Sequence, residues 1–382
     1  MTRRRNKPLE RLNYPKAIDS NCPIRETSAM MKINHAVDRT ILVAGPSYWG
    51  YVKMIADGFR SCGLKATTLE WTTPGTSIID DVKFVTSERC RILRQEAHDI
   101  LNSRRLEKMV LSSNPDYVLV VKGTRISSTL ARFCLSNDVT LALWAYDSAQ
   151  HVPLIKEIVN DYSLAYFYES TDLMLFPNKS NTKFLPMAYD PSYYHPIHGD
   201  TENPIDICFV GSLTDYPLRR ETIMKLAKSF PNLVIEVSSE PRLYYPLFWL
   251  QDYVRFGCRG KLHFGRRSLS HAEINTIYGQ SRMCLNIHHT QSKKAVNPRT
   301  FEILGSGGFL MSDRRMDGIH DFEVGRDFES YISQADLIEK VQFYIDNPEL
   351  MRSISNSGHE RVLRNHTYQH RARSILADID DL

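Results

Sequence analysis

The chain has 382 residues, 42% of them hydrophobic and 24% charged, a composition that excludes a disordered or fibrous protein. This length exceeds what one hydrophobic core normally serves, so two domains are expected. The formal net charge of +4, from 48 basic and 44 acidic residues, is too small to indicate a nucleic-acid-binding protein.

Residues 1–38 form an arm whose first eleven residues include five basic side chains and only one acidic one. We interpret the arm as partly disordered and solvated, with weak attraction to anionic lipid or nucleic acid as the alternative. No long apolar run follows it, which argues against a signal peptide, and no stretch approaches the roughly twenty apolar residues of a transmembrane helix. The seven cysteines are scattered without CxxC pairs, which favours reduced thiols in a cytoplasmic protein over disulfides or a zinc site.

From Arg39 onward, short β-rich runs alternate with helical stretches, a pattern typical of a parallel sheet covered by helices on both faces. The expected strands are 40–45, 65–71, 116–121, 139–146, 163–168 and 182–189, and the expected helices are 51–62, 87–112, 126–135 and 153–160. Gly63 is expected to cap the first helix. Residues 39–189 are therefore predicted to form a first Rossmann-like domain.

Residues 190–204 are rich in turn formers and lack periodicity, so we interpret them as a hinge. The alternation then restarts. The expected strands are 206–211, 232–237, 261–265, 282–287 and 308–312, and the expected helices are 217–229, 270–279, 298–306, 334–346, 349–364 and 368–379. Ser270 and Glu273 form a capping box. A second Rossmann-like domain is predicted over 205–365, followed by a C-terminal helix within 366–382.

The stretch most informative about chemistry is 285–313, where a strand leads through a basic loop into a helix beginning near Pro298. A helix N-terminus presents free N–H groups to an anion, and Lys294 and Arg299 can add charge-assisted hydrogen bonds to phosphate. Glu302 on the same helix would repel phosphate but can accept both hydroxyls of a ribose. The alternative is that Arg299 and Glu302 form an ordinary surface pair on an amphipathic helix.

This stretch resembles the donor site of group-1 GT-B glycosyltransferases, and specifically of their spore-maturation-type branch. The matching elements are Leu285-Asn286-Ile287-His288, Asn297, Arg299, Phe301-Glu302, Gly307-Gly308 and Asp313. Three further segments are similar to the same family: "FVGS" (209–212) followed by Arg219-Arg220, "LPMAYDPSYYHP" (185–196) and "HTYQHRA" (366–372). The resemblance spans 185–382, and the N-terminal half matches more loosely, mainly through "LWAYDS" (143–148).

The resemblance implies an α/β fold of the GT-B type, in which two Rossmann-like, doubly wound parallel-sheet domains face each other across a cleft. It implies transfer of a hexose-type sugar from a nucleotide-diphosphate donor, with UDP expected, to a hydroxyl on a glycan, small molecule or protein, without a cofactor. Many group-1 enzymes carry a second glutamate eight places before Glu302, where this chain has Lys294, so their retaining mechanism is not carried over. The donor-binding residues implied are Gly211, Ser212, Arg219, His288, Lys294, Asn297, Arg299, Glu302, Gly307 and Gly308. At Gly211 and Ser212 a plain strand-to-helix turn is the alternative.

Candidates for a catalytic base lie at the ends of predicted strands. Asp147 is the first, with His151 one helical turn later, and His288 is the second. A helix cap at Asp147 and a sugar-hydroxyl contact at His288 remain the alternatives. Tyr48 and Trp49 follow the first strand, where they would either stack on the acceptor or pack in the core.

No metal is expected, because the only Asp-x-Asp pair, Asp378-Ile379-Asp380, is interpreted as a frayed acidic terminus. Arg299, Lys294 and the helix dipole would instead stabilise the leaving diphosphate. The apolar segment 244–250 is either a buried helix face or a peripheral membrane contact. Two other functions stay open, a nucleotide-sugar epimerase of the same double-Rossmann fold and a non-catalytic sugar-nucleotide-binding protein, and a nucleic-acid acceptor is a minor alternative.

Overall fold

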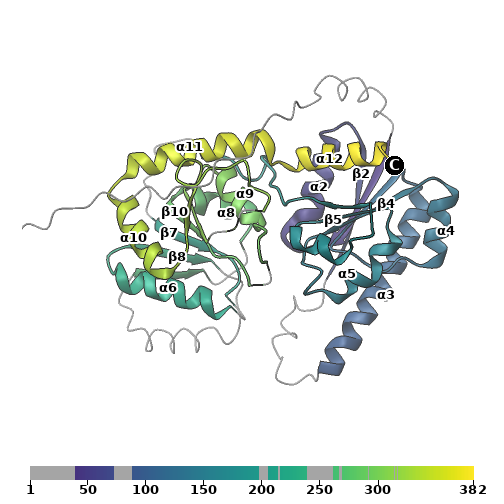
Figure 1. The fold of residues 1–382 in the computed structure, drawn as a ribbon, viewed down its shortest axis with the longest axis horizontal. Helices are drawn as coiled ribbons and strands as arrows, with labels where there is room; N and C mark the ends of the chain where they lie inside the picture. The colour runs from purple at the N-terminus through teal and green to yellow at the C-terminus, as the bar shows by residue number, and fades with distance from the viewer. Residues whose placement is uncertain are drawn as a thin grey trace, which may run out of the picture.

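The computed structural model describes residues 39–72, 88–197, 205–213, 216–238, 261–265, 269–290, 292–313, 315 and 317–382. Two six-stranded sheets organise these residues, one in each lobe of the molecule (Figure 1). The first contains β1 (Thr40–Pro46), β2 (Lys65–Trp71), β3 (Tyr117–Val121), β4 (Thr140–Ala145), β5 (Leu164–Phe167) and β6 (Thr182–Phe184), in the order β2-β1-β3-β4-β5-β6. The second contains β7 (Ile205–Val210), β8 (Val234–Ser238), β9 (Lys261–Gly265), β10 (Ser281–Asn286), β11 (Leu310–Asp313) and β12 (Glu329–Tyr331), in the order β12-β11-β10-β7-β8-β9.

Every strand pair in both sheets is parallel, so helices must connect the strands across the faces of the sheets. The helices of the first lobe are α2 (Tyr51–Arg60), α3 (Glu88–Ser113), α4 (Ser128–Ser136) and α5 (Pro153–Ile158). Those of the second are α6 (Pro217–Ser229), α8 (His271–Gly279), α9 (Pro298–Gly305), α10 (Gln334–Ile345) and α11 (Pro348–Asn365), and α12 (Tyr368–Asp380) closes the chain. The predicted α/β class with two parallel sheets is confirmed.

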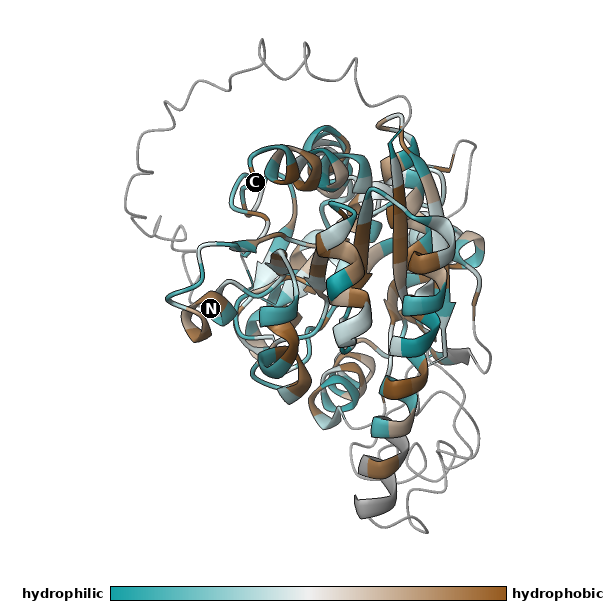
Figure 2. Cartoon of the chain, turned by 90° about the vertical axis from the view of Figure 1, so that its right-hand side faces the viewer, coloured by the Kyte–Doolittle hydropathy of each residue, from teal (hydrophilic) through white to brown (hydrophobic). Residues whose placement is uncertain are grey.

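Local sequence signals explain several of these elements. The middle of β1, Leu42 to Ala44, is completely buried, as expected for an apolar strand covered on both faces. In Figure 2 the inner strands are largely brown, whereas the surrounding helices also carry hydrophilic teal turns. The predicted capping box is present, because the Ser270 and Glu273 side chains each accept a hydrogen bond from the other residue's backbone N–H.

The C-terminal helix returns to the first lobe, where α12 lies beside α2 (Figure 1). Near its end, Asp378 accepts hydrogen bonds from Tyr166 (3.0 Å) and Lys183 (2.5 Å), and Asp380 pairs with Arg39 (2.8 Å). The interpretation of these two aspartates as a frayed terminus is therefore wrong. Both are used to attach α12 to the first lobe.

The chain crosses between the lobes at two places that lie side by side. The first crossing follows β6, and the second joins α11 to α12. Tyr189 and Thr367 form a parallel β-bridge between them, with N–H groups donating from Tyr189 to His366 O (3.3 Å) and from Tyr368 to Tyr189 O (3.0 Å). The predicted strand over 182–189 is accordingly shorter, ending at Phe184, and its last residues belong to this crossing.

The two lobes also share one apolar core. A single cluster of buried side chains runs from Phe59 and Trp144 in the first lobe to Tyr278 and Phe301 in the second. Burial of apolar surface between the lobes stabilises their observed arrangement.

Some predicted features lie outside the described residues, namely the arm 1–38, the end of the hinge at 198–204 and the apolar segment 244–250. None of the helices within the described ranges combines the length and apolar character needed to cross a bilayer. Four cysteines in the described ranges carry free thiols: Cys62, Cys134, Cys208 and Cys284.

Candidate functional site

The strand order of the second sheet identifies where a ligand should bind. From β7 the chain proceeds to β8 and β9 on one side, and then returns to place β10, β11 and β12 on the other. Ligands of doubly wound sheets occupy the crevice beyond the carboxyl ends of the strands at such a switch point. Gly211 and Ser212 follow β7, and His288 follows β10, so these three predicted residues lie at that edge.

Arg299 and Gly211 meet at this edge. Arg299 lies in the first turn of α9, and its guanidinium is 3.1 Å from the position that a Cβ atom would take on Gly211. Gly211 also has a φ of 154°, which favours glycine. The lack of a side chain at Gly211 thus allows the guanidinium to approach the backbone after β7.

Glu302 lies one turn further along α9, and its side chain is buried, with the residue only 5% exposed. The Tyr51 hydroxyl, from the first lobe, donates to its Oε1 at 3.4 Å. Burial raises the pKa of Glu302 to about 7, although the Arg299 charge and the Tyr51 hydrogen bond favour ionisation. The alternative of an ordinary surface pair is wrong for Glu302, because the carboxyl group is enclosed between the lobes.

Arg219 holds the two loops of the switch point together. Its buried guanidinium donates to the carbonyl oxygens of Ile287 (2.9 Å) and Ser212 (2.7 Å) and lies 4.4 Å from the centre of the Tyr216 ring. Burial and the neighbouring Arg299 charge lower its pKa to about 9, so it remains charged at neutral pH. These contacts connect the carboxyl ends of β7 and β10.

His288 is paired with Asp313, the last residue of β11. The His288 ring Nδ1 lies 2.5 Å from Asp313 Oδ1, which also accepts the His288 backbone N–H at 2.9 Å. Burial opposes ionisation of Asp313, but the contacts with His288 and Arg315 prevail and lower its pKa. Within the described residues, His288 Nε2 and the Tyr331 hydroxyl are buried without a hydrogen-bond partner, which is unusual for buried polar atoms.

The other predicted donor residues lie elsewhere in the second lobe, outside the contact between Arg299 and Gly211. Asn297 exchanges two side-chain hydrogen bonds with Asn286, at 3.0 and 3.2 Å, and so fixes the start of α9 to the end of β10. The Lys294 side chain is exposed in the loop between these elements. Gly307 and Gly308 lie beyond the far end of α9, where Gly307 faces Pro196, so the structure does not bring this pair to the carboxyl edge.

In the first lobe, Asp147 follows β4 and forms a 2.9 Å salt bridge with Lys122, which follows β3. The carboxyl edge of the first sheet thus carries a partly exposed carboxylate whose position is fixed by a lysine. His151 is exposed in the turn after Asp147, and its N–H donates to Ser148 O at 2.9 Å.

The predicted acceptor residues lie next to the second lobe. Trp49 is 36% exposed, so the core-packing alternative is wrong for this residue. At Gly50, a Cβ would come within 3.1 Å of His271 Nε2 on α8, which shows how closely this loop approaches the second lobe. The side chain of Tyr48 lies outside the described part of the chain.

Two residues of this region were not singled out from the sequence: Tyr51 and Glu169. Glu169 follows β5 and contacts the loop between β10 and α9. Its position directly after a predicted strand was the same signal that identified Asp147. Tyr51 carried no comparable signal, because its contact with Glu302 spans 251 residues of sequence.

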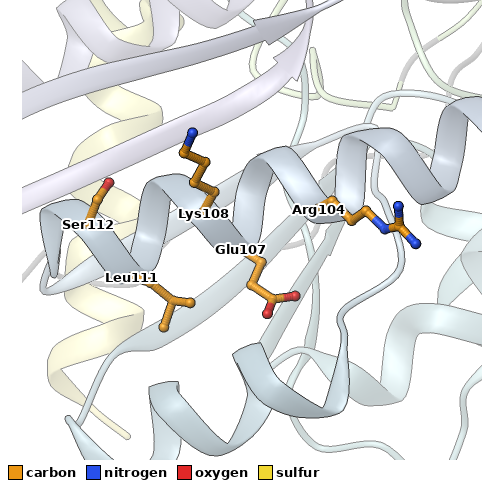
Figure 3. Close-up of a pocket in the computed structure, with 5 residues that line it drawn as sticks. All are labelled: Arg104, Glu107, Lys108, Leu111 and Ser112. Atoms are coloured by element: carbon orange, nitrogen blue, oxygen red, sulfur yellow. The ribbon is translucent and has the colours of Figure 1, made fainter.

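Two other features bear on what this region can bind. Among the described residues, no three His, Cys, Asp or Glu side chains gather closely enough to hold a metal ion. A hollow along α3 is lined by Arg104, Glu107, Lys108, Leu111 and Ser112 (Figure 3). This hollow contains none of the residues at the carboxyl edges of the two sheets. Its Glu107 carboxylate accepts a hydrogen bond from the Ser127 hydroxyl at 2.6 Å.

Comparisons with known proteins bear on the fold and on the sequence of the second lobe. Residues 219–377 match a family model described as glycosyl transferase-like. The structure is similar to sucrose-phosphate synthase from Thermosynechococcus elongatus, with a TM-score of 0.62, 9% identity and coverage of 89% of this chain and 98% of that one. It is also similar to HepE from Anabaena in complex with UDP, with a TM-score of 0.61, 10% identity and coverage of 90% and 100%.

A third similar structure is the α,α-trehalose 6-phosphate synthase from Burkholderia multivorans, with a TM-score of 0.60, 10% identity and coverage of 90% and 97%. A comparison of the sequence with curated proteins gave no match. At such low identities the structural likeness shows the fold alone. The chain therefore has the GT-B fold of these enzymes, and its C-terminal half carries a glycosyl transferase-like sequence.

Proposed function

We propose that the chain transfers a sugar from a nucleoside-diphosphate donor, with UDP as the nucleotide, to a hydroxyl group of an acceptor. The observation that carries this proposal is the Arg299 guanidinium at the start of α9, packed against the Gly211 backbone at the switch point. A guanidinium beside free helix N–H groups suits a diphosphate. HepE, which has the same fold, was solved with UDP and with UDP-glucose.

Glu302 would bind the ribose of the donor. Its carboxyl group already accepts a hydroxyl, that of Tyr51, in a site where hydrogen bonds are strengthened by burial. In the donor complex, ribose hydroxyls would take the place of the Tyr51 hydroxyl. This exchange would put the nucleoside between the lobes and the diphosphate at the start of α9.

The chemical step would be a substitution at the anomeric carbon of the donor sugar. The acceptor oxygen forms a bond to this carbon as the bond to the diphosphate oxygen breaks, and UDP leaves with the electron pair. Arg299, the exposed Lys294 and the N–H groups of α9 would stabilise the charge that develops on the diphosphate. In this proposal the reaction is metal-independent.

Asp147 is the first candidate for the group that takes the proton of the acceptor hydroxyl. It lies at the carboxyl edge of the first sheet, and Lys122 fixes its position. His288 is the second candidate, because Asp313 engages Nδ1 and leaves the Nε2 lone pair without a partner among the described residues. The acceptor would bind in the first lobe near the partly exposed Trp49.

The proposal is tested first by ligand binding. Thermal shifts with UDP, GDP and ADP should show the largest rise in melting temperature with UDP, because a ligand of the folded state stabilises it. Arg299→Ala should abolish most of this shift. Arg282→Ala is the matched control, since Arg282 pairs with Asp206 (3.2 Å) at the opposite edge of the same sheet. If Arg299→Ala binds UDP like the wild type, the proposed site is misplaced.

Turnover measurements with nucleotide sugars then distinguish a transferase from the two alternative functions. A transferase should release UDP from a UDP-sugar at a rate that rises with added acceptor, tested with mixtures of sugar and small-molecule alcohols. Conversion of the UDP-sugar into an isomeric UDP-sugar without acceptor would indicate an epimerase instead. Tight binding with no turnover of any nucleotide sugar would indicate a non-catalytic binding protein.

A further inference from the structure

Three consecutive residues after β5 connect the first lobe to the second, and we call Tyr168, Glu169 and Ser170 the clasp. The Tyr168 and Ser292 hydroxyl groups are hydrogen-bonded at 2.8 Å, and the Ser170 hydroxyl donates to Asp317. Glu169, between them, contacts the loop that joins β10 to α9. The clasp therefore contacts the second lobe through every one of its side chains.

The central contact is made by a single carboxylate oxygen. Glu169 Oε2 accepts the backbone N–H groups of three successive residues of the second lobe, Lys293 (2.9 Å), Lys294 (3.1 Å) and Ala295 (3.2 Å). Its other oxygen accepts the Thr171 hydroxyl at 3.0 Å, and the residue is 0% exposed. Burial alone would raise the pKa of Glu169, but these hydrogen bonds prevail and lower it, so the group is ionised.

The opposite side of the same loop is held by its own lobe. Asp317 N–H donates to Lys294 O at 3.1 Å, and Val296 N–H donates to Asp317 O at 3.3 Å. The loop then continues directly into Asn297 and the first turn of α9. Its backbone is thus fixed between Asp317 on one side and Glu169 on the other, immediately before Arg299.

We infer that Glu169 is a positioning residue for donor binding, which acts from the first lobe by fixing the backbone that carries Lys294 and leads into α9. This inference rests on the proposed function, because it concerns the same diphosphate site. Since the carboxylate and the three N–H groups belong to different lobes, separating the lobes would release the loop. The affinity for the donor would therefore depend on the relative position of the lobes.

Two substitutions test this role. Glu169→Gln keeps the size and one acceptor oxygen but removes the charge, and Glu169→Ala leaves three buried N–H groups without their acceptor. We expect faster hydrogen exchange in the 292–297 segment in both variants and UDP binding weakened about tenfold in Glu169→Gln and more in Glu169→Ala, because charge-assisted hydrogen bonds are the stronger ones. In transfer assays the KM for the donor should rise more than the KM for the acceptor.

The control is a buried carboxylate of the second lobe that makes no contact with the clasp. Asp327 is 0% exposed and accepts the Glu323 N–H (2.8 Å) and the Ser357 hydroxyl (2.6 Å). Asp327→Asn should lower the melting temperature while leaving UDP affinity, measured well below that temperature, unchanged. If it weakens UDP binding as much as Glu169→Gln does, the effect is one of general stability and the inference is overturned.

Two further results would overturn the inference while leaving the proposed function intact. One is hydrogen exchange of the 292–297 amides that is as fast in the wild-type protein as in an unprotected loop. This exchange is measured without nucleotide. The other is a Glu169→Gln variant that binds UDP as tightly as the wild type although its 292–297 amides exchange faster. If the wild-type protein itself does not bind UDP, the proposed function fails, and the donor role of Glu169 fails with it.

Discussion

Replacing Glu302 with glutamine should stabilise the protein at alkaline pH while weakening donor binding. Glutamine has nearly the shape of a protonated carboxyl group but carries no charge at any pH. Glu302 is buried, and its pKa is raised from 4.5 to about 7. The ionised form is therefore disfavoured in the folded protein, and Glu302→Gln removes that penalty.

The sign and size of the effect follow from this shift. A raised pKa in the folded state contributes stability that is complete below pH 4.5, the unfolded value, and is lost as the pH rises through about 7. One pKa unit corresponds to about 1.4 kcal/mol, so ionised Glu302 costs about 3 kcal/mol at pH 8 and less than about 1 kcal/mol at pH 5. For a lobe of this size, Glu302→Gln should raise the melting temperature at pH 8 by roughly 5–10 °C.

The assay is thermal unfolding of both proteins at pH 5 and pH 8, with UDP titrations at pH 8. Glu302→Gln should melt higher than the wild type at pH 8 and almost equally at pH 5, and it should bind UDP more weakly. Glu329→Gln is the control, because Glu329 is also buried but is paired with Lys340 (3.0 Å) and Tyr344 (2.6 Å), so its loss should destabilise at both pH values. Equal destabilisation of Glu302→Gln at pH 5 and pH 8 would refute the reasoning.

Three other predictions concern the same site. Gly211→Ala would place a methyl group 3.1 Å from the Arg299 guanidinium, and should weaken UDP binding at least about tenfold in a calorimetric titration. Gly325→Ala, where an added Cβ meets no atom within 4 Å, should have little effect on UDP binding. Asp147→Asn should leave UDP affinity intact but lower kcat by about 100-fold or more, and an unchanged kcat would remove it as the base. Excess EDTA should leave the transfer rate unchanged, and a loss restored by added Mg²⁺ or Mn²⁺ would contradict metal-independent catalysis.

The sequence predicted most of the elements because their signals are local. Helix α6 begins and ends at Pro217 and Ser229 as expected, since proline suits the first turn of a helix. The signals failed where a strand is too short to show a pattern. β12 has only three residues, Glu329 to Tyr331, and pairs with β11 because of the sheet around it.

The candidate site was predictable where its residues share the carboxyl edge of one sheet. Gly211 and Arg299 meet as the order of strands and helices implied. Gly307 and Gly308 stand near Arg299 in sequence, but α9 separates them from it by about 12 Å, its eight residues rising roughly 1.5 Å each. Adjacency in a motif therefore did not mean adjacency in space.

Contacts between the lobes could not be predicted, because no local pattern encodes them. Glu302 accepts a hydrogen bond from Tyr51 of the other lobe, and the clasp joins Glu169 to residues more than 120 positions later. Such pairs form only when the two lobes pack against each other. Their chemistry was visible in the sequence as isolated polar residues, but their partners were not.

The bridge between Tyr189 and Thr367 limits how the lobes can move. Two chain segments bonded side by side resist twisting far more than a single flexible tether would, so any opening of the molecule is restricted to bending about one axis. For the same reason, a protease that cuts only the first segment would leave a nicked protein whose halves stay attached. Excising the first lobe as an independent fragment would require joining α12, from the other end of the chain, to it.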